Sequence, residues 1–120
     1  MARRDITGAV DFAILEGFTG GDAQVTEEVL NLFREQAELW STMLVPSSPG
    51  WRDAAHTVKG AAAGIGAVTL ARVCGEAEVA ADSLAEPVLD RVRTALDQAL
   101  ADVAAYQHEQ MLRSLKGGFD

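Results

Sequence analysis

Residues that interrupt helices are few in this sequence, and they gather in a small number of clusters. The strongest cluster is the proline- and serine-rich loop at 46–50, and further breaks fall at 20–22, 64–66 and 85–87. The stretches between them are rich in alanine, leucine, glutamate, glutamine and arginine, which favour helices. No strand-like alternation of apolar and polar residues occurs. This spacing predicts a chain built of helices that are joined by short loops.

Apolar residues recur at steps of three and four in each stretch, which places them on one face of a helix. The first stripe follows Asp22, a predicted N-cap, and the last follows Pro87. In chain order the predicted stripes are Val25, Val29, Leu32, Phe33, Trp40 and Met43; then Trp51, Ala55, Val58, Ala62 and Ile65; then Leu70, Val73, Cys74, Ala77, Ala80 and Leu84; then Leu89, Val92, Leu96, Ala99, Val103 and Tyr106.

Four amphipathic helices joined by short loops predict an all-α fold, an up-down-up-down four-helix bundle. A short extra N-terminal helix is predicted over 11–17, with Phe12, Leu15 and Phe18 as its apolar contacts. The domain is expected to span 9–114, with flexible termini at 1–8 and 115–120. Ordinary burial preferences place the aromatic side chains in the core: Phe12, Phe33, Trp40, Trp51 and Tyr106.

Composition excludes several classes of function. With 10 basic and 18 acidic side chains the net charge is −8, which argues against nucleic-acid binding and against a polybasic membrane anchor. No apolar run approaches the roughly 20 residues of a membrane span. The N-terminal residues have no apolar stretch typical of a signal peptide, so none is expected, and a cytoplasmic protein is expected. The single cysteine, Cys74, excludes a disulfide framework and is expected to be a buried, inert thiol.

One histidine lies outside the apolar stripe of its helix. On a helical wheel His56 falls about 140° from the centre of its stripe, which predicts a solvent-exposed imidazole. Arg52 and Lys59 lie within one turn of it, although the chain is acidic overall and has only two lysines, and Gly60 follows at the next turn. A glycine inside a helix costs about 1 kcal/mol relative to alanine. Because Gly60 faces away from the core, clearance for a partner that reaches the imidazole would explain it.

An exposed imidazole flanked by cations is suited to carrying a transferred phosphoryl group. The ring nitrogen is a nucleophile, and ammonium or guanidinium groups stabilise charge on phosphoryl oxygens. A single surface histidine on a helix is nevertheless most often an ordinary solvated side chain. Spacing alone therefore leaves both interpretations open.

The run His56-Thr57-Val58-Lys59-Gly60-Ala61-Ala62-Ala63-Gly64-Ile65-Gly66-Ala67 resembles the signature of histidine-containing phosphotransfer (HPt) domains. That signature is His-x-x-Lys-Gly-Ser/Ala followed by a Gly-Ala pair that opens the next helix. Further pieces match in order: Gly20-Gly21-Asp22, then Leu70 with Cys74, then Glu78. The similarity covers about residues 9–110. It implies a bacterial two-component phosphorelay protein that accepts a phosphoryl group from a receiver-domain aspartate and passes it to another response regulator.

The resemblance also implies roles for particular residues. His56 matches the phosphoacceptor, Lys59 the residue that stabilises phosphoryl charge, and Gly60 the small residue that leaves clearance for the receiver. Glu78 matches a polar residue that orients the imidazole through its Nδ1–H. A partner surface is expected around these positions, at Arg52, Asp53, Ala63, Gly64, Ala67, Val68 and Arg72. His108 is expected to be a bystander.

The implied partners are receiver domains and a hybrid or other sensor histidine kinase. No cofactor and no metal site are expected in the chain itself, because Mg²⁺ is expected in the receiver's acidic pocket. A histidine kinase is disfavoured, since there is no glycine-rich nucleotide loop and no room for an ATP-binding domain. The remaining alternative is a non-catalytic helical-bundle adaptor that binds signalling partners without being phosphorylated.

Overall fold

Over residues 7–117, the part of the chain that this computed structural model describes, the backbone forms helices and no strand. In chain order they are α1 (Phe12–Thr19), α2 (Ala23–Met43), α3 (Trp51–Ile65), α4 (Val68–Val79), the short 3-10 helix η1 (Asp82–Leu84) and α5 (Ala85–Gly117).

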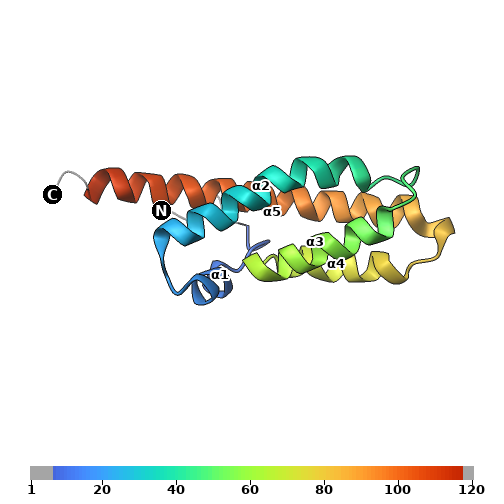
Figure 1. The fold of residues 1–120 in the computed structure, drawn as a ribbon, viewed down its shortest axis with the longest axis horizontal. Helices are drawn as coiled ribbons and strands as arrows, with labels where there is room; N and C mark the ends of the chain where they lie inside the picture. The colour runs from blue at the N-terminus through green and yellow to red at the C-terminus, as the bar shows by residue number, and fades with distance from the viewer. Residues whose placement is uncertain (1–6, 118–120) are drawn as a thin grey trace.

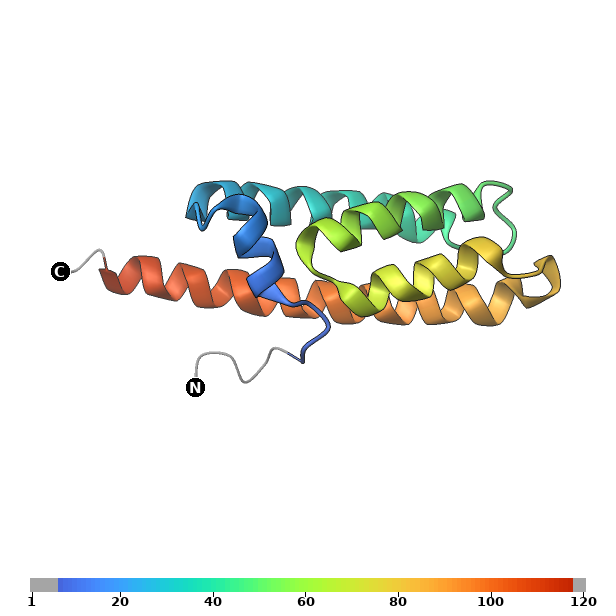
Figure 2. The same cartoon turned by 90° about the horizontal axis from the view of Figure 1, so that it is seen from below.

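Helices α2, α3, α4 and α5 alternate in direction along the long axis of the molecule (Figure 1). α3 and α4 form an antiparallel hairpin that packs against α2 and α5, and α5 extends past the end of this hairpin (Figure 2). α1 crosses the bundle beside the α3–α4 turn. The predicted all-α bundle with a short N-terminal helix is confirmed. None of the helices in the described residues is long and apolar enough to cross a membrane.

Asp22 begins α2 and Gly66 ends α3 at positions that the sequence suggests. Asp22 accepts a hydrogen bond from the backbone N–H of Val25 at 3.0 Å, which satisfies one of the free donors at the start of α2. Gly66 ends α3 in the left-handed region, with φ of 84°. Its backbone N–H and that of Ala67 bond back to the last turn of α3. The chain therefore reverses within two residues before α4 begins.

The core lies between the four long helices, and the five aromatic side chains assigned to it are buried. The rings of Phe12 and Tyr106 stack with their centroids 4.2 Å apart, which ties α1 to α5. The Tyr106 hydroxyl donates a hydrogen bond to the Glu16 carboxylate at 2.6 Å, so the polar end of this ring is also satisfied.

Four apolar residues assigned to the core are exposed instead: Phe18, Val25, Leu32 and Leu84. On α2 the buried stripe is Thr26, Leu30, Phe33, Ala37 and Trp40. Val25 and Leu32 each precede a member of this stripe by one residue, which turns them about 100° away from the core. Thr26 is tolerated in the core because its hydroxyl donates to the Asp22 carbonyl oxygen at 2.8 Å. Phe18 lies in the last turn of α1, and Leu84 lies in η1 because α4 ends at Val79.

A buried aspartate fixes the segment that leads into α1. The carboxylate of Asp102 on α5 accepts hydrogen bonds from the backbone N–H groups of Thr7 and Val10, at 2.8 and 3.1 Å. The next residue, Asp11, donates its backbone N–H to the carbonyl oxygen of Gly66 at 2.8 Å. The expected flexibility of 1–8 and 115–120 concerns residues that lie mostly outside the described range, and α5 continues through Gly117.

Replacing Gly66 by alanine should destabilise the protein strongly. A Cβ atom at Gly66 would overlap the Asp11 carbonyl oxygen, and its φ is one that residues with a Cβ rarely adopt. We expect the free energy of unfolding to fall by about 2 kcal/mol or more. The matched control is Gly64→Ala, where a Cβ meets nothing within 4 Å, and it should be neutral or stabilising by up to about 1 kcal/mol. Urea unfolding of both variants checks this, and equal effects would contradict the assignment.

Candidate functional site

His56 lies on the solvent-facing side of α3. The side chains that α3 buries are Trp51, Ala54, Ala55, Val58, Ala62 and Ile65. The His56 side chain, on the other side, is 70% exposed. The exposure predicted from the helical wheel is therefore what the structure shows, and the ring is open to a macromolecular partner.

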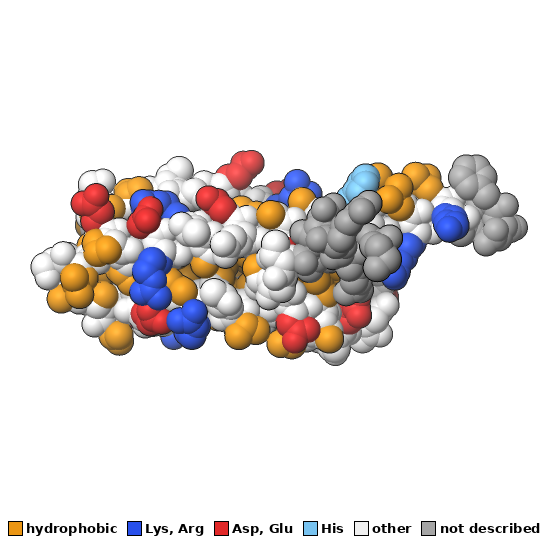
Figure 3. All heavy atoms as spheres, turned by 180° about the vertical axis from the view of Figure 1, so that it is seen from behind, with side chains coloured by type: hydrophobic (Ala, Val, Ile, Leu, Met, Phe, Trp, Pro, Cys, Tyr) orange, Lys and Arg blue, Asp and Glu red, His pale blue; other side chains and the backbone are white. Residues whose placement is uncertain are grey.

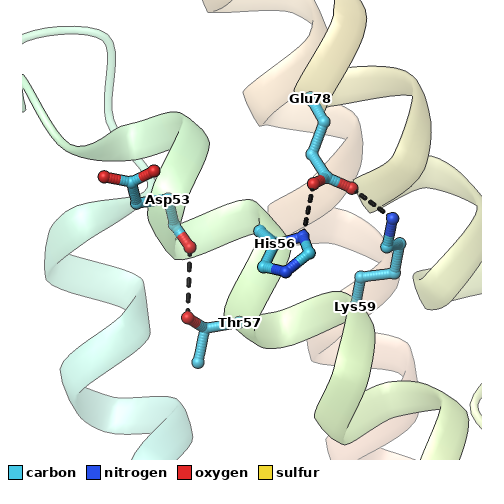
Figure 4. Close-up of polar contacts among 5 residues, drawn as sticks. All are labelled: Asp53, His56, Thr57, Lys59 and Glu78. Atoms are coloured by element: carbon cyan, nitrogen blue, oxygen red, sulfur yellow. Dashed lines mark hydrogen bonds and ion pairs between the residues drawn. The ribbon is translucent and has the colours of Figure 1, made fainter.

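Glu78 on α4 reaches across the hairpin and contacts both His56 and Lys59 (Figure 4). One carboxylate oxygen, Oε1, lies 2.6 Å from His56 Nδ1, and the other, Oε2, lies 2.6 Å from Lys59 Nζ. A carboxylate only accepts hydrogen bonds, so Nδ1 is the donor in this contact, and in the neutral ring it is the protonated nitrogen. Nε2 then carries the free lone pair, on the side of the ring that points away from Glu78.

The register of the α3–α4 hairpin brings these side chains together. His56 and Glu78 are placed symmetrically about Ala67 in the sequence, and they are in contact. Arg52 and Asp82 are symmetric about the same residue and form an ion pair at 2.7 Å. A step of four residues back along α3, from His56 to Arg52, thus corresponds to a step of four residues forward across the turn, from Glu78 to Asp82. This is the pairing expected of two antiparallel segments.

The charges around Glu78 keep its carboxylate ionised. The hydrogen bond from Lys59, followed by the hydrogen bond from His56, holds the pKa of Glu78 below its ordinary value of 4.5, although partial burial opposes this. An ionised carboxylate on Nδ1 fixes the orientation of the imidazole.

Arg52 does not lie free beside the imidazole, contrary to the expectation that it flanks His56 as a second cation. Its guanidinium donates to the carbonyl oxygen of Ala80 at 2.6 Å, pairs with Asp82, and stacks 4.2 Å from the centre of the Trp51 ring. These contacts satisfy the end of α4, where backbone carbonyl groups lack helical partners. Lys59 is therefore the cation that the structure places next to the imidazole and its carboxylate.

The α3 surface beside His56 has no side chain at Gly60 or Gly64. A Cβ atom at Gly60 or at Gly64 would meet nothing within 4 Å, and Gly60 is exposed. Neither glycine has a positive φ, so the backbone itself does not require glycine at these positions. The absence of side chains leaves open space along α3 next to the imidazole.

The predicted partner surface is largely exposed, with one exception. Asp53, Ala63, Val68 and Arg72 are exposed, whereas Gly64 and Arg52 are half-buried. Ala67 is fully buried, because the tight turn folds its side chain into the core, and we leave it out of this surface. Sequence reasoning missed Val79, which is 85% exposed and follows Glu78 directly. The predicted apolar stripe of this helix runs to Leu84, whereas α4 ends at Val79. Val79 therefore lies at the exposed end of the helix.

Charged side chains elsewhere do not form a basic patch on the face that Figure 3 shows. There, lysine and arginine side chains are interspersed with aspartate and glutamate. Among the described residues, Glu76 pairs with both Arg72 and Arg91 at 2.8 Å. This arrangement gives no support to a nucleic-acid interface, which gathers basic side chains on one face.

The remaining candidates are a buried cysteine on α4 and an exposed histidine on α5. Cys74 is fully buried, and its burial, followed by the charge of Glu78, raises the pKa of its thiol to about 12, with Lys59 acting in the opposite direction. The predicted burial of this thiol is confirmed. His108 is exposed on α5. Within the described residues no three histidine, cysteine, aspartate or glutamate side chains are grouped closely enough to hold a metal ion.

Removing the Lys59 ammonium should raise the pKa of Glu78. In Lys59→Ala we expect a clear rise toward 4.5, and in His56→Gln a smaller one, because the Lys59 hydrogen bond is the larger cause. Carbon-13 NMR titration of the Glu78 carboxyl group measures both. Since the folded-state pKa is lowered, the stability that this carboxylate contributes is present above about pH 4.5 and lost as the pH falls through the folded-state pKa. An unchanged Glu78 titration in Lys59→Ala would contradict the arrangement.

Comparison with known proteins agrees with this geometry. The family model described as "Hpt domain" matches residues 28–105. The crystal structure of the histidine phosphotransferase ShpA from Caulobacter crescentus superimposes with a TM-score of 0.80 at 62% sequence identity, covering 90% of this chain and 99% of that one. No curated protein matches the sequence. Because the family model spans most of the bundle, and the fold and an exposed histidine agree with it, this chain belongs to the Hpt domain family.

Proposed function

We propose that this protein is a phosphorelay intermediate in which His56 Nε2 accepts a phosphoryl group from an aspartyl phosphate of one receiver domain and passes it to another. Hpt proteins exchange phosphoryl groups with receiver domains and histidine kinases, and these are the proposed partners. The observation that best supports the role of His56 is its contact with Glu78: the His56 imidazole is exposed, and the Glu78 carboxylate holds its Nδ1.

This contact prepares the ring for nucleophilic attack. Because Glu78 holds the proton on Nδ1, the lone pair of Nε2 is free and directed to solvent. In the forward step this lone pair forms a bond to phosphorus while the bond from phosphorus to the aspartyl oxygen breaks, and the aspartate leaves as a carboxylate. The ring becomes positively charged and keeps its Nδ1 proton, and the Glu78 carboxylate stabilises that charge.

The second transfer, from His56 to the next receiver, uses the same groups. An aspartate of the next receiver attacks phosphorus, the bond to Nε2 breaks, and the lone pair returns to the ring. The charge on Glu78 is unchanged throughout, so the carboxylate acts by orientation and electrostatics rather than by taking the proton. This matches phosphoryl transfer in general, which depends mainly on positioning and on charge stabilisation.

Lys59 would stabilise negative charge on the phosphoryl oxygens. It lies one turn after His56 on the same side of α3, and its Nζ is held on the carboxylate that also holds the ring. Mg²⁺, as the family resemblance implies, would be held by the receiver's acidic residues, and Lys59 is the charge that this chain itself adds.

Clearance along α3 would allow the receiver to approach. Gly60 follows His56 by one turn, and the space where its Cβ would lie is empty. A side chain here would stand beside the path to Nε2. The helix-propensity cost of a mid-helix glycine, about 1 kcal/mol, is then offset by access for the receiver.

Substitution of His56 tests the proposal. Incubation with a phosphorylated receiver domain should give the wild type an acid-labile, base-stable label, and His56→Gln should give none. Because the side chain is exposed, His56→Gln should keep the helicity and nearly the melting temperature of the wild type. The matched control is His108→Gln on α5, which should be labelled like the wild type.

Two results would contradict the proposal. Persistent labelling of a folded His56→Gln variant would place the phosphoryl group elsewhere. If no receiver domain of the source organism transfers label to the wild type, while partner binding is intact, the adaptor function is favoured instead.

A further inference from the structure

Lys59 reaches Glu78 by crossing the surface of α4 at Gly75. Its Nζ lies 2.6 Å from Glu78 Oε2, and its Cδ lies 3.8 Å from the point where a Cβ of Gly75 would be. Gly75 and Lys59 are symmetric about Ala67, so they face each other across the hairpin in the same register as His56 and Glu78. The aliphatic part of Lys59 therefore lies over the one residue of this α4 surface that has no side chain.

The backbone gives no reason for a glycine here. Gly75 lies within α4, and its φ is not among the positive values in the chain. A glycine in a helix interior costs about 1 kcal/mol relative to alanine. Among the described residues, and apart from its chain neighbours and the backbone of α4 itself, the Lys59 side chain is the only neighbour within 4 Å of a Cβ built at Gly75. The space that Gly75 leaves is thus used by Lys59.

The available space admits a methyl group and little more. A Cβ at 3.8 Å from Lys59 Cδ is an ordinary van der Waals contact. A further carbon extends about 1.5 Å beyond Cβ, and it starts from a Cβ that is already in van der Waals contact with the Lys59 stem. A larger side chain at Gly75 would therefore occupy the path of the Lys59 stem.

We propose that Gly75 is a positioning residue, whose missing side chain lets Lys59 lie across α4 and hold its ammonium on the carboxylate that also binds the His56 imidazole. This inference rests on the proposed function for its effect on phosphoryl transfer, but not for the effect on the Lys59–Glu78 contact itself. Gly75 acts through Lys59 and does not touch the reacting atoms.

Two substitutions of Gly75 that share a high helix propensity separate space from backbone effects. In Gly75→Ala we expect the Glu78 carboxyl titration and the transfer rate of the wild type, with equal or greater thermal stability. In Gly75→Leu we expect the Glu78 titration to shift upward as in Lys59→Ala. Transfer from a phosphorylated receiver should slow by the same factor as in Lys59→Ala, on the order of tenfold, the effect expected from the loss of one hydrogen bond to a charged group.

The combination of Gly75→Leu with Lys59→Ala tests whether the leucine acts through Lys59. If it does, adding Gly75→Leu to Lys59→Ala changes neither the titration nor the rate further. Equal slowing by Gly75→Leu in both backgrounds would show that the leucine only blocks the receiver, and would overturn the proposal. A wild-type Glu78 titration in folded Gly75→Leu would overturn it too.

The titration requires no phosphoryl donor, so it tests this inference even if His56 is not the phosphoacceptor. Should Gly75→Leu not fold, Gly75→Gln carries the same expectations with a flexible side chain of similar helix propensity. A wild-type titration in Gly75→Gln would then overturn the proposal.

Discussion

The tight turn between α3 and α4 is the constraint on which the rest of this molecule depends. Gly66 adopts a left-handed conformation that reverses the chain, and its carbonyl oxygen also anchors Asp11 at the entry to α1. A turn of fixed geometry sets the register of two antiparallel helices. In this register His56 faces Glu78, although 22 residues separate them in sequence. A shift of this register by one residue would turn a side chain by about 100° around its helix and separate His56 from Glu78.

The hairpin assigns different tasks to residues that look alike in sequence. Arg52 and Lys59 both lie one turn from His56, yet Arg52 closes the end of α4 while Lys59 joins the Glu78 carboxylate. The glycines divide in the same way. Gly66 is required by backbone conformation, whereas Gly60 leaves open solvent beside the imidazole. Charge and space are thus arranged around one imidazole by neighbours on two helices.

Much of this was predictable from sequence, because the exposure of His56 follows from helical periodicity and the resemblance pointed to Glu78. The errors arose where position depends on tertiary contacts. The stripe of α2 was misplaced because a hydrogen-bonded threonine, Thr26, occupies a core position that apolar patterns assign to its neighbours. Ala67 was expected at the surface because the direction of a turn residue is not encoded in periodicity. Gly75 was missed, because a mid-helix glycine that faces a lysine on the neighbouring helix can be recognised only when the register of the two helices is known.

The central claim is that Glu78 holds the proton of His56 on Nδ1 and so leaves Nε2 as the nucleophile. Nitrogen-15 NMR of the His56 ring, at a pH where the ring is neutral, measures this directly. We expect a protonated Nδ1 and an unprotonated Nε2 before transfer, and a phosphorus–nitrogen coupling at Nε2 afterwards. A neutral ring protonated on Nε2, or a phosphoryl group on Nδ1, would contradict it.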